Sequence, residues 1–109
     1  MNVRRYVWQR LTAALLLPLV VIHLIVIFYA TQKGLSAADI LARTRGSVAW
    51  AIFYGAFVIA AAVHAPIGLR NVLAEWTPLG SRACDIIAVL FGAVLAVLGF
   101  RAVTAVVWP

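Results

Sequence analysis

The side chains most capable of chemistry lie in one stretch, residues 64–76, which begins inside an apolar run and ends in a charged segment. Residues four and eleven apart share a face of a helix, so His64, Gly68 and Glu75 are expected on one side. A neutral imidazole can bind a metal ion, and a small neighbour leaves room for a flat, bulky group beside it. Pro66 lacks an amide hydrogen and crowds the preceding turn, which predicts a kink in this helix.

The elements that carry this stretch are long and apolar. The chain has 109 residues, 66% of them hydrophobic, and a mean hydropathy of +1.08. A soluble domain of this size cannot bury so much apolar surface. A helix needs ~20 mostly apolar residues to cross a bilayer, and three continuous runs meet this length, at approximately 11–31, 48–73 and 83–107. We therefore expect an all-α fold with three transmembrane helices, forming a single membrane domain over residues 1–109.

The net charge of +6 is spread along the chain, with basic residues flanking the apolar runs. This distribution favours contact with membrane lipid headgroups and excludes a nucleic-acid partner. One side of the predicted membrane domain carries Arg4, Arg5, Arg10, Arg70 and Arg82. The other side carries Lys33, Arg43, Arg45 and Arg101. The small excess predicts a cytoplasmic N-terminus.

Acidic residues stand near two predicted helix starts. Ser36 and Asp39 have the spacing of a capping box, which predicts a short interfacial helix near residues 37–43. Asp85 is expected in the first turn of the third span, where a negative charge suits the helix dipole. In the same span, Gly92 and Gly99 lie seven residues apart and predict a surface for close helix packing.

A second histidine, His23, lies inside the first span. Helix counting places His23 ~20 Å in from Arg10, and His64 ~15 Å in from the end of its own span. This difference in depth argues against one metal shared by both imidazoles. A hydrogen-bonded contact between helices is the favoured interpretation of His23, although intramembrane ionisable residues are candidates for function.

Two sequence patterns carry a resemblance to a known family. The pattern Trp8-Gln9-Arg10-Leu11-Thr12-Ala13 precedes the first span, and the second pattern is His64-x-x-x-Gly68-Leu69-Arg70-Asn71-x-x-x-Glu75-Trp76. Together they resemble the membrane anchor (cytochrome b) subunits of succinate dehydrogenase and fumarate reductase, most closely the small anchor, over nearly the whole chain. The resemblance implies half of a haem-binding helix bundle in the bacterial inner membrane. It also implies docking of an iron–sulfur subunit and a flavoprotein subunit in a respiratory complex.

For the haem, the resemblance identifies His64 as the ligand to the iron of haem b, within the core motif that includes Gly68. Neutral imidazole is a good iron ligand. Arg70 is expected to pair with a haem propionate.

For the quinone, either ubiquinone or menaquinone, the resemblance points to the cytoplasmic end of the helices. Arg10 corresponds to the quinone-pocket arginine of the large anchor, and Glu75 occupies the usual aspartate position. Trp76 stands where the small anchor has a tyrosine, so an indole N–H replaces a phenolic hydroxyl. These three residues are expected at the same membrane depth.

Several alternatives remain at this point. The second haem ligand would come from a different anchor subunit or from a second copy of this chain. A cofactor-free accessory subunit would also fit the three spans. A small drug–proton exporter fits poorly, because such proteins have four spans and a carboxylate deep in the first span, which here contains no acid.

Overall fold

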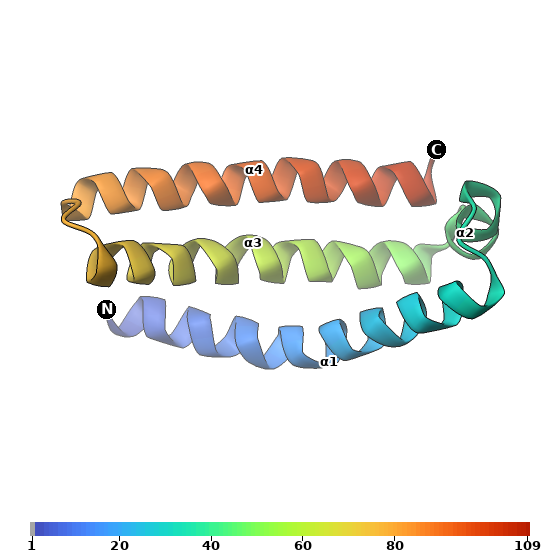
Figure 1. Ribbon diagram of the computed structural model, residues 1–109, viewed down its shortest axis with the longest axis horizontal. Coiled ribbons are helices and arrows are strands. Elements are labelled where there is room, and N and C mark those ends of the chain that lie inside the picture. The colour runs from blue at the N-terminus through green and yellow to red at the C-terminus, as the bar shows by residue number, and fades with distance from the viewer. Residues whose placement is uncertain (1) are drawn as a thin grey trace.

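The computed structural model describes residues 2–109, and the chain forms four helices. They are α1 (Val3–Lys33), α2 (Ala37–Thr44), α3 (Val48–Trp76) and α4 (Ser81–Val107). Among the described residues there is no strand, so the predicted all-α fold is confirmed. Figure 1 shows α1, α3 and α4 side by side and α2 at one end.

The three long helices correspond to the three predicted spans, and each is long and apolar enough to cross a membrane. They extend beyond the apolar runs: α1 begins at Val3 rather than near residue 11, and α3 continues to Trp76. A helix satisfies its backbone hydrogen bonds internally, so it can continue from the hydrocarbon core into the headgroup layer without losing any of them. The molecule is 47 Å along its longest axis, close to the ~40–45 Å of a whole bilayer.

Helix α3 lies between α1 and α4 and contacts both (Figure 1). Glycines of α4 allow the closest approach. A Cβ atom added at Gly92 would lie 2.8 Å from Pro66 Cγ, and one added at Gly99 would lie 2.6 Å from Val58 Cγ1. The predicted packing surface of the third span is therefore confirmed, and its partner is α3 of the same chain.

The predicted kink at Pro66 is wrong, because α3 is a single helix that runs straight in Figure 1. Pro66 is buried, and its ring packs against Gly92 of α4. A Cβ atom at Gly92 would also lie 3.3 Å from the Ala62 carbonyl oxygen, which Pro66 leaves without its usual amide partner. A Cα hydrogen of Gly92 therefore faces this oxygen, a contact that recurs between closely packed helices. The helix that curves is α1, which contains Pro18.

The short helix α2 begins where the capping pattern predicts it. The Ser36 hydroxyl oxygen accepts a hydrogen bond from the Asp39 amide at 3.1 Å and donates one to the Asp39 carboxylate at 2.6 Å. The helix extends one residue beyond the predicted range 37–43. The predicted capping box and the short helix that it begins are therefore confirmed.

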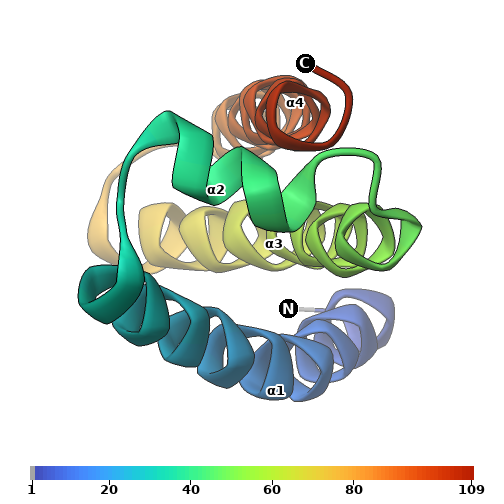
Figure 2. The ribbon, with the colours of Figure 1, turned by 90° about the vertical axis from the view of Figure 1, so that its right-hand side faces the viewer.

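Helix α2 lies across the end of the bundle where α4 terminates (Figure 2). The Thr44 hydroxyl donates to the Val106 carbonyl at 2.7 Å, and the Gly46 amide donates to the Val107 carbonyl at 2.7 Å. The last carbonyls of a helix have no partner within it. The connection between α1 and α3 therefore satisfies the C-terminus of α4 and fixes the position of α2.

Candidate functional site

His64 lies at the interface between α3 and α1. Its Nδ1 atom is 3.1 Å from the hydroxyl oxygen of Thr12, which belongs to α1. Thr12 is buried, with 7% of its surface exposed, and the imidazole is half-buried. The predicted haem ligand is thus an interhelical residue whose ring is held by a hydrogen bond from outside its own helix.

Gly68, one turn beyond His64, also faces α1. A Cβ atom added there would lie 3.4 Å from Gln9 Nε2. The Gln9 side chain fills the space beside the glycine, and its Oε1 atom is buried without a hydrogen-bond partner among the described residues. The space that Gly68 leaves beside the imidazole is therefore occupied by the Gln9 side chain of α1.

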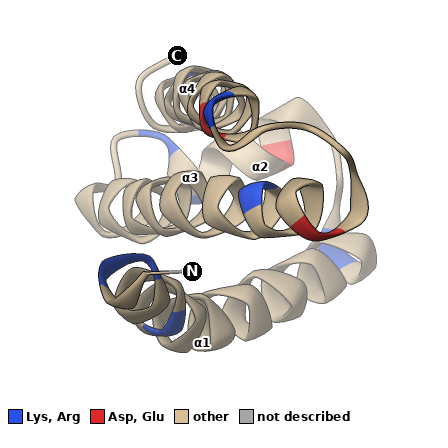
Figure 3. Cartoon of the chain, turned by 90° about the vertical axis from the view of Figure 1, so that its left-hand side faces the viewer, with Lys and Arg blue, Asp and Glu red and all other residues tan. Residues whose placement is uncertain are grey.

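Arg70 takes part in a charged junction that joins all three long helices. Its Nε atom donates to Asp85 Oδ1 at 2.5 Å, and its Nη2 atom donates to the Ser81 hydroxyl at 3.2 Å. Arg5 of α1 reaches the same Asp85 oxygen at 3.4 Å. The charged residues at this end of the bundle are visible in Figure 3.

The prediction that Asp85 lies in the first turn of its helix is wrong. Helix α4 begins at Ser81 and has no acidic residue in its first turn. Asp85 lies in the second turn and faces Arg70 and Arg5 instead. This junction between Arg5, Arg70 and Asp85 was not predicted from the sequence. The sequence does contain a signal for this junction, because Arg70 and Asp85 carry opposite charges on either side of the short turn between α3 and α4.

Arg70 and His64 are on different sides of α3. Arg70 borders a cavity of about 530 Å³ between α3 and α4, together with Pro66 and Gly92. His64 points to α1 and does not line this cavity. The structure therefore does not bring the expected propionate partner next to the expected iron ligand within one chain.

The three residues expected at the quinone are all exposed. The Arg10 guanidinium lies over the ring of Tyr6 at 5.6 Å from its centroid, a cation–π contact within α1. Trp76 is 82% exposed. Among residues 2–109, the ion pairs at this end of the bundle join Arg5, Arg70 and Asp85, and none joins Arg10 to Glu75.

The expectation that these residues share one membrane depth is wrong. Gln9, the neighbour of Arg10, lies against Gly68. Glu75 follows Gly68 by seven residues of α3, which is ~10 Å along the helix axis. The antiparallel register of α1 and α3 decides this offset, and counting residues within separate helices cannot determine it.

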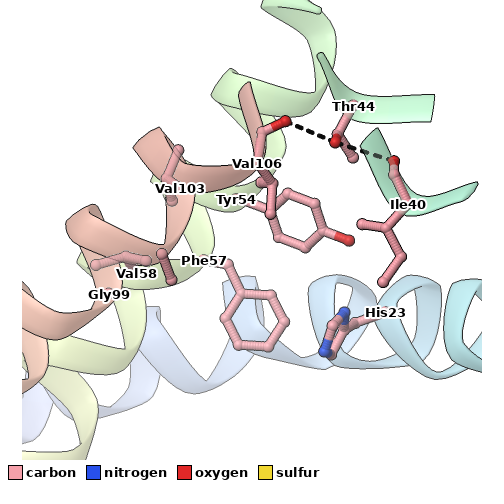
Figure 4. Close-up of a pocket in the computed structure, with 10 residues that line it drawn as sticks. His23, Ile40, Thr44, Tyr54, Phe57, Val58, Gly99, Val103 and Val106 are labelled. Carbon is pink, nitrogen blue, oxygen red and sulfur yellow. Dashed lines mark hydrogen bonds between the residues drawn. The ribbon is translucent and has the colours of Figure 1, made fainter. Parts of the chain in front are cut away.

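His23 lies near the opposite end of the bundle and borders an apolar cavity of about 290 Å³ (Figure 4). Its ring meets Tyr54 and Phe57 of α3 edge-on, with centroid distances of 5.8 and 5.4 Å. His23 thus makes the predicted contact between helices, but through aromatic ring edges; the hydrogen bond expected for this contact is wrong for Nδ1. The Nδ1 atom is buried with no hydrogen-bond partner in the described part of the chain.

The two histidines are at different depths, as predicted. Phe57, which contacts His23, precedes His64 by seven residues on α3, or ~10 Å. One metal ion cannot bridge imidazoles separated in this way, because metal–nitrogen bonds are ~2 Å long.

Fold and site together define a multi-pass helical membrane protein with an interhelical histidine in its central helix. A comparison with known protein families identifies the family within this class. The family described as succinate dehydrogenase/fumarate reductase transmembrane subunit matches residues 2–105, and the chain belongs to this family. A search of curated proteins and a search of solved structures each found no match.

Proposed function

We propose that this chain is a haem-binding membrane anchor of a succinate:quinone oxidoreductase, in which His64 supplies one axial ligand to haem b. The observation that carries the proposal is the contact between His64 Nδ1 and Thr12. It occupies one ring nitrogen and leaves Nε2 for a ligand. Metal-binding histidines are usually held in this way through the nitrogen that does not bind the metal.

The donor set fits a haem better than a bare metal ion. No group of three or more His, Cys, Asp or Glu side chains able to hold a metal occurs among the described residues. A porphyrin brings four nitrogen ligands of its own, so the protein needs to add only axial ones. A bound haem would accept and pass on single electrons, with a potential set by its axial ligands and surroundings.

Arg70 keeps a place in this proposal. A guanidinium has five N–H donors, and the bonds to Asp85 and Ser81 use two of them. The remaining donors can bind a carboxylate in the cavity between α3 and α4. His64 lies on the other side of α3, so a propionate of its haem would have to pass the edge of α3 to reach Arg70. Asp85 would then hold the arginine in place.

For the quinone, we propose a site at the end of the bundle where α1 begins and α3 ends. Arg10 is exposed there and can donate to a quinone carbonyl. Glu75 and Trp76 lie further out, nearer to the surface where the iron–sulfur and flavoprotein subunits would dock. Because Arg10 and this pair are at different depths, a partner chain would close the pocket between them.

The proposed location is the bacterial inner membrane, with the N-terminus in the cytoplasm. The basic residues in the first turns of α1, near the end of α3 (Arg70) and at the start of α4 (Arg82) support this orientation. The second haem ligand comes from a partner anchor, which we propose to be a different subunit, with a second copy of this chain as the alternative. Gly92 and Gly99 are already packed against α3, so the partner must meet other surfaces.

The test is the reduced-minus-oxidised spectrum of membranes that contain the complex. His64→Ala should remove or strongly perturb the haem b bands while the helices remain inserted. His23→Ala is the matched control, since it removes the chain's other imidazole at a different depth, and it should leave the bands in place. An unchanged spectrum in His64→Ala would reduce His64 to a packing residue. The absence of haem bands from the native complex would favour a cofactor-free accessory subunit.

A further inference from the structure

We infer that Thr12 is a positioning residue that sets the tautomer and orientation of His64. In this arrangement the Thr12 hydroxyl accepts a hydrogen bond from Nδ1–H, and Nε2 carries the lone pair. The tautomer follows from the geometry alone, and only the identity of the ligand at Nε2 rests on the proposed function.

The direction of the hydrogen bond follows from the acceptors around Thr12. A threonine hydroxyl has a single hydrogen to donate. The Trp8 carbonyl oxygen lies 2.7 Å from Thr12 Oγ1, and the Gln9 carbonyl oxygen lies at 3.2 Å. Threonine in a helix commonly donates to the carbonyl four residues before it. The shorter contact therefore takes the hydrogen, and the hydroxyl oxygen presents a lone pair to the imidazole.

The His64 imidazole must then supply the hydrogen for its own contact with the Thr12 hydroxyl oxygen. Its Nδ1 atom is 3.1 Å from Thr12 Oγ1, a distance at which two lone pairs would repel each other. A neutral imidazole carries one N–H, so an Nδ1–H form leaves Nε2 unprotonated. An unprotonated nitrogen is the form that binds a metal.

Burial makes this assignment consequential. Thr12 is 7% exposed and lies between two apolar helices, where water does not compete for its hydroxyl. Loss of the hydroxyl would leave the Nδ1–H at this half-buried helix interface without its partner, which is more costly than loss of an exposed hydrogen bond. The ring would then rotate or change its tautomer to find another partner.

The chain contains a matched residue that lacks this role. Thr31, also on α1, donates to the Phe28 carbonyl at 2.7 Å, but it is exposed. Thr31→Val thus removes the same group and a hydrogen bond to a carbonyl of the preceding turn, as Thr12→Val does.

The first experiment needs no haem. The full chain in detergent micelles, labelled with ¹⁵N-histidine and carrying His23→Gln, has His64 as its one histidine. We expect ¹⁵N resonances of a protonated Nδ1 and an unprotonated Nε2, and a change in this pattern in Thr12→Val but not in Thr31→Val. A predominant Nε2–H form, or a pattern that Thr12→Val leaves unchanged, would overturn the inference.

The second experiment uses the assembled complex and measures haem affinity and midpoint potential. Loss of a group that orients a metal-binding histidine typically lowers metal affinity by ~10–100-fold. We expect a loss of this size and a shifted potential in Thr12→Val, with recovery in Thr12→Ser, which keeps the hydroxyl. Equal behaviour of Thr12→Val and Thr31→Val would contradict the role of Thr12.

The two experiments also separate this inference from the proposed function. If His64→Ala leaves the haem spectrum unchanged, the haem assignment fails. The ¹⁵N result would still decide whether Thr12 sets the tautomer of His64.

Discussion

The substitution Gly99→Ala should weaken the packing of α4 on α3. The new Cβ atom would lie 2.6 Å from Val58 Cγ1 and 2.8 Å from Val58 Cγ2. Carbon atoms in contact prefer a separation of ~3.5–4.0 Å, so the overlap is about 1 Å. Both methyl groups of Val58 are too close, and valine in a helix has one strongly preferred χ1 rotamer. Side-chain rotation therefore cannot relieve the overlap, and the helices must move apart.

The expected loss follows from this geometry. Overpacking of a well-packed interface costs about 1–3 kcal/mol, which is roughly a 5- to 150-fold change in the unfolding equilibrium. Reversible denaturation in mixed micelles, followed by tryptophan fluorescence, measures this change. Gly55→Ala is the control, because a Cβ atom there meets nothing within 4 Å. Gly55→Ala should gain about 0.5–1 kcal/mol from the higher helix propensity of alanine. Gly99→Ala receives the same gain, so the difference between the two variants measures the clash.

A double substitution tests the contact itself. Val58→Ala removes both clashing methyl groups, so Gly99→Ala should cost much less in that background than in the native chain. Coupling between residues in contact is typically about 0.5–3 kcal/mol. Equal costs in the two backgrounds, or a Gly99→Ala variant as stable as Gly55→Ala, would refute the packing argument.

Three further predictions concern the chain in its membrane. In a cysteine-free background, Ala38→Cys should react with an impermeant thiol reagent from outside, and Pro78→Cys should react only after permeabilisation; the reverse pattern would invert the topology. Arg10→Ala should lower electron transfer to quinone and leave transfer to a soluble dye intact, whereas equal losses would indicate failed assembly. Native mass spectrometry of the purified complex should find one copy of this chain beside a different anchor, and two copies without another small hydrophobic subunit would establish the symmetric arrangement.

The sequence by itself determined the fold class and the number of spans. Three continuous apolar runs cannot be buried in a chain of 109 residues, and a bilayer requires each run to satisfy its own backbone as a helix. The start of α2 was equally local, because Ser36 and Asp39 are close in the chain. The packing role of Gly92 and Gly99 was also predictable, since only small residues allow two helix backbones to approach closely.

The tertiary structure alone decided how the helices face one another. The register between α1 and α3 pairs Thr12 with His64 and Gln9 with Gly68, over more than fifty residues of sequence in each case. That register separates Arg10 from Glu75 in depth.

Asp85 illustrates the same limit. From the sequence, the favoured role of Asp85 was an interaction with the dipole of its own helix, because a negative charge near a helix start is stabilising. In the folded chain Asp85 bridges Arg70 and Arg5. A short ion pair depends on the rotation of each helix about its own axis, and side-chain packing across the whole interface sets that rotation. Residue types therefore predict which groups can do chemistry, while the packing of the helices determines which of them meet.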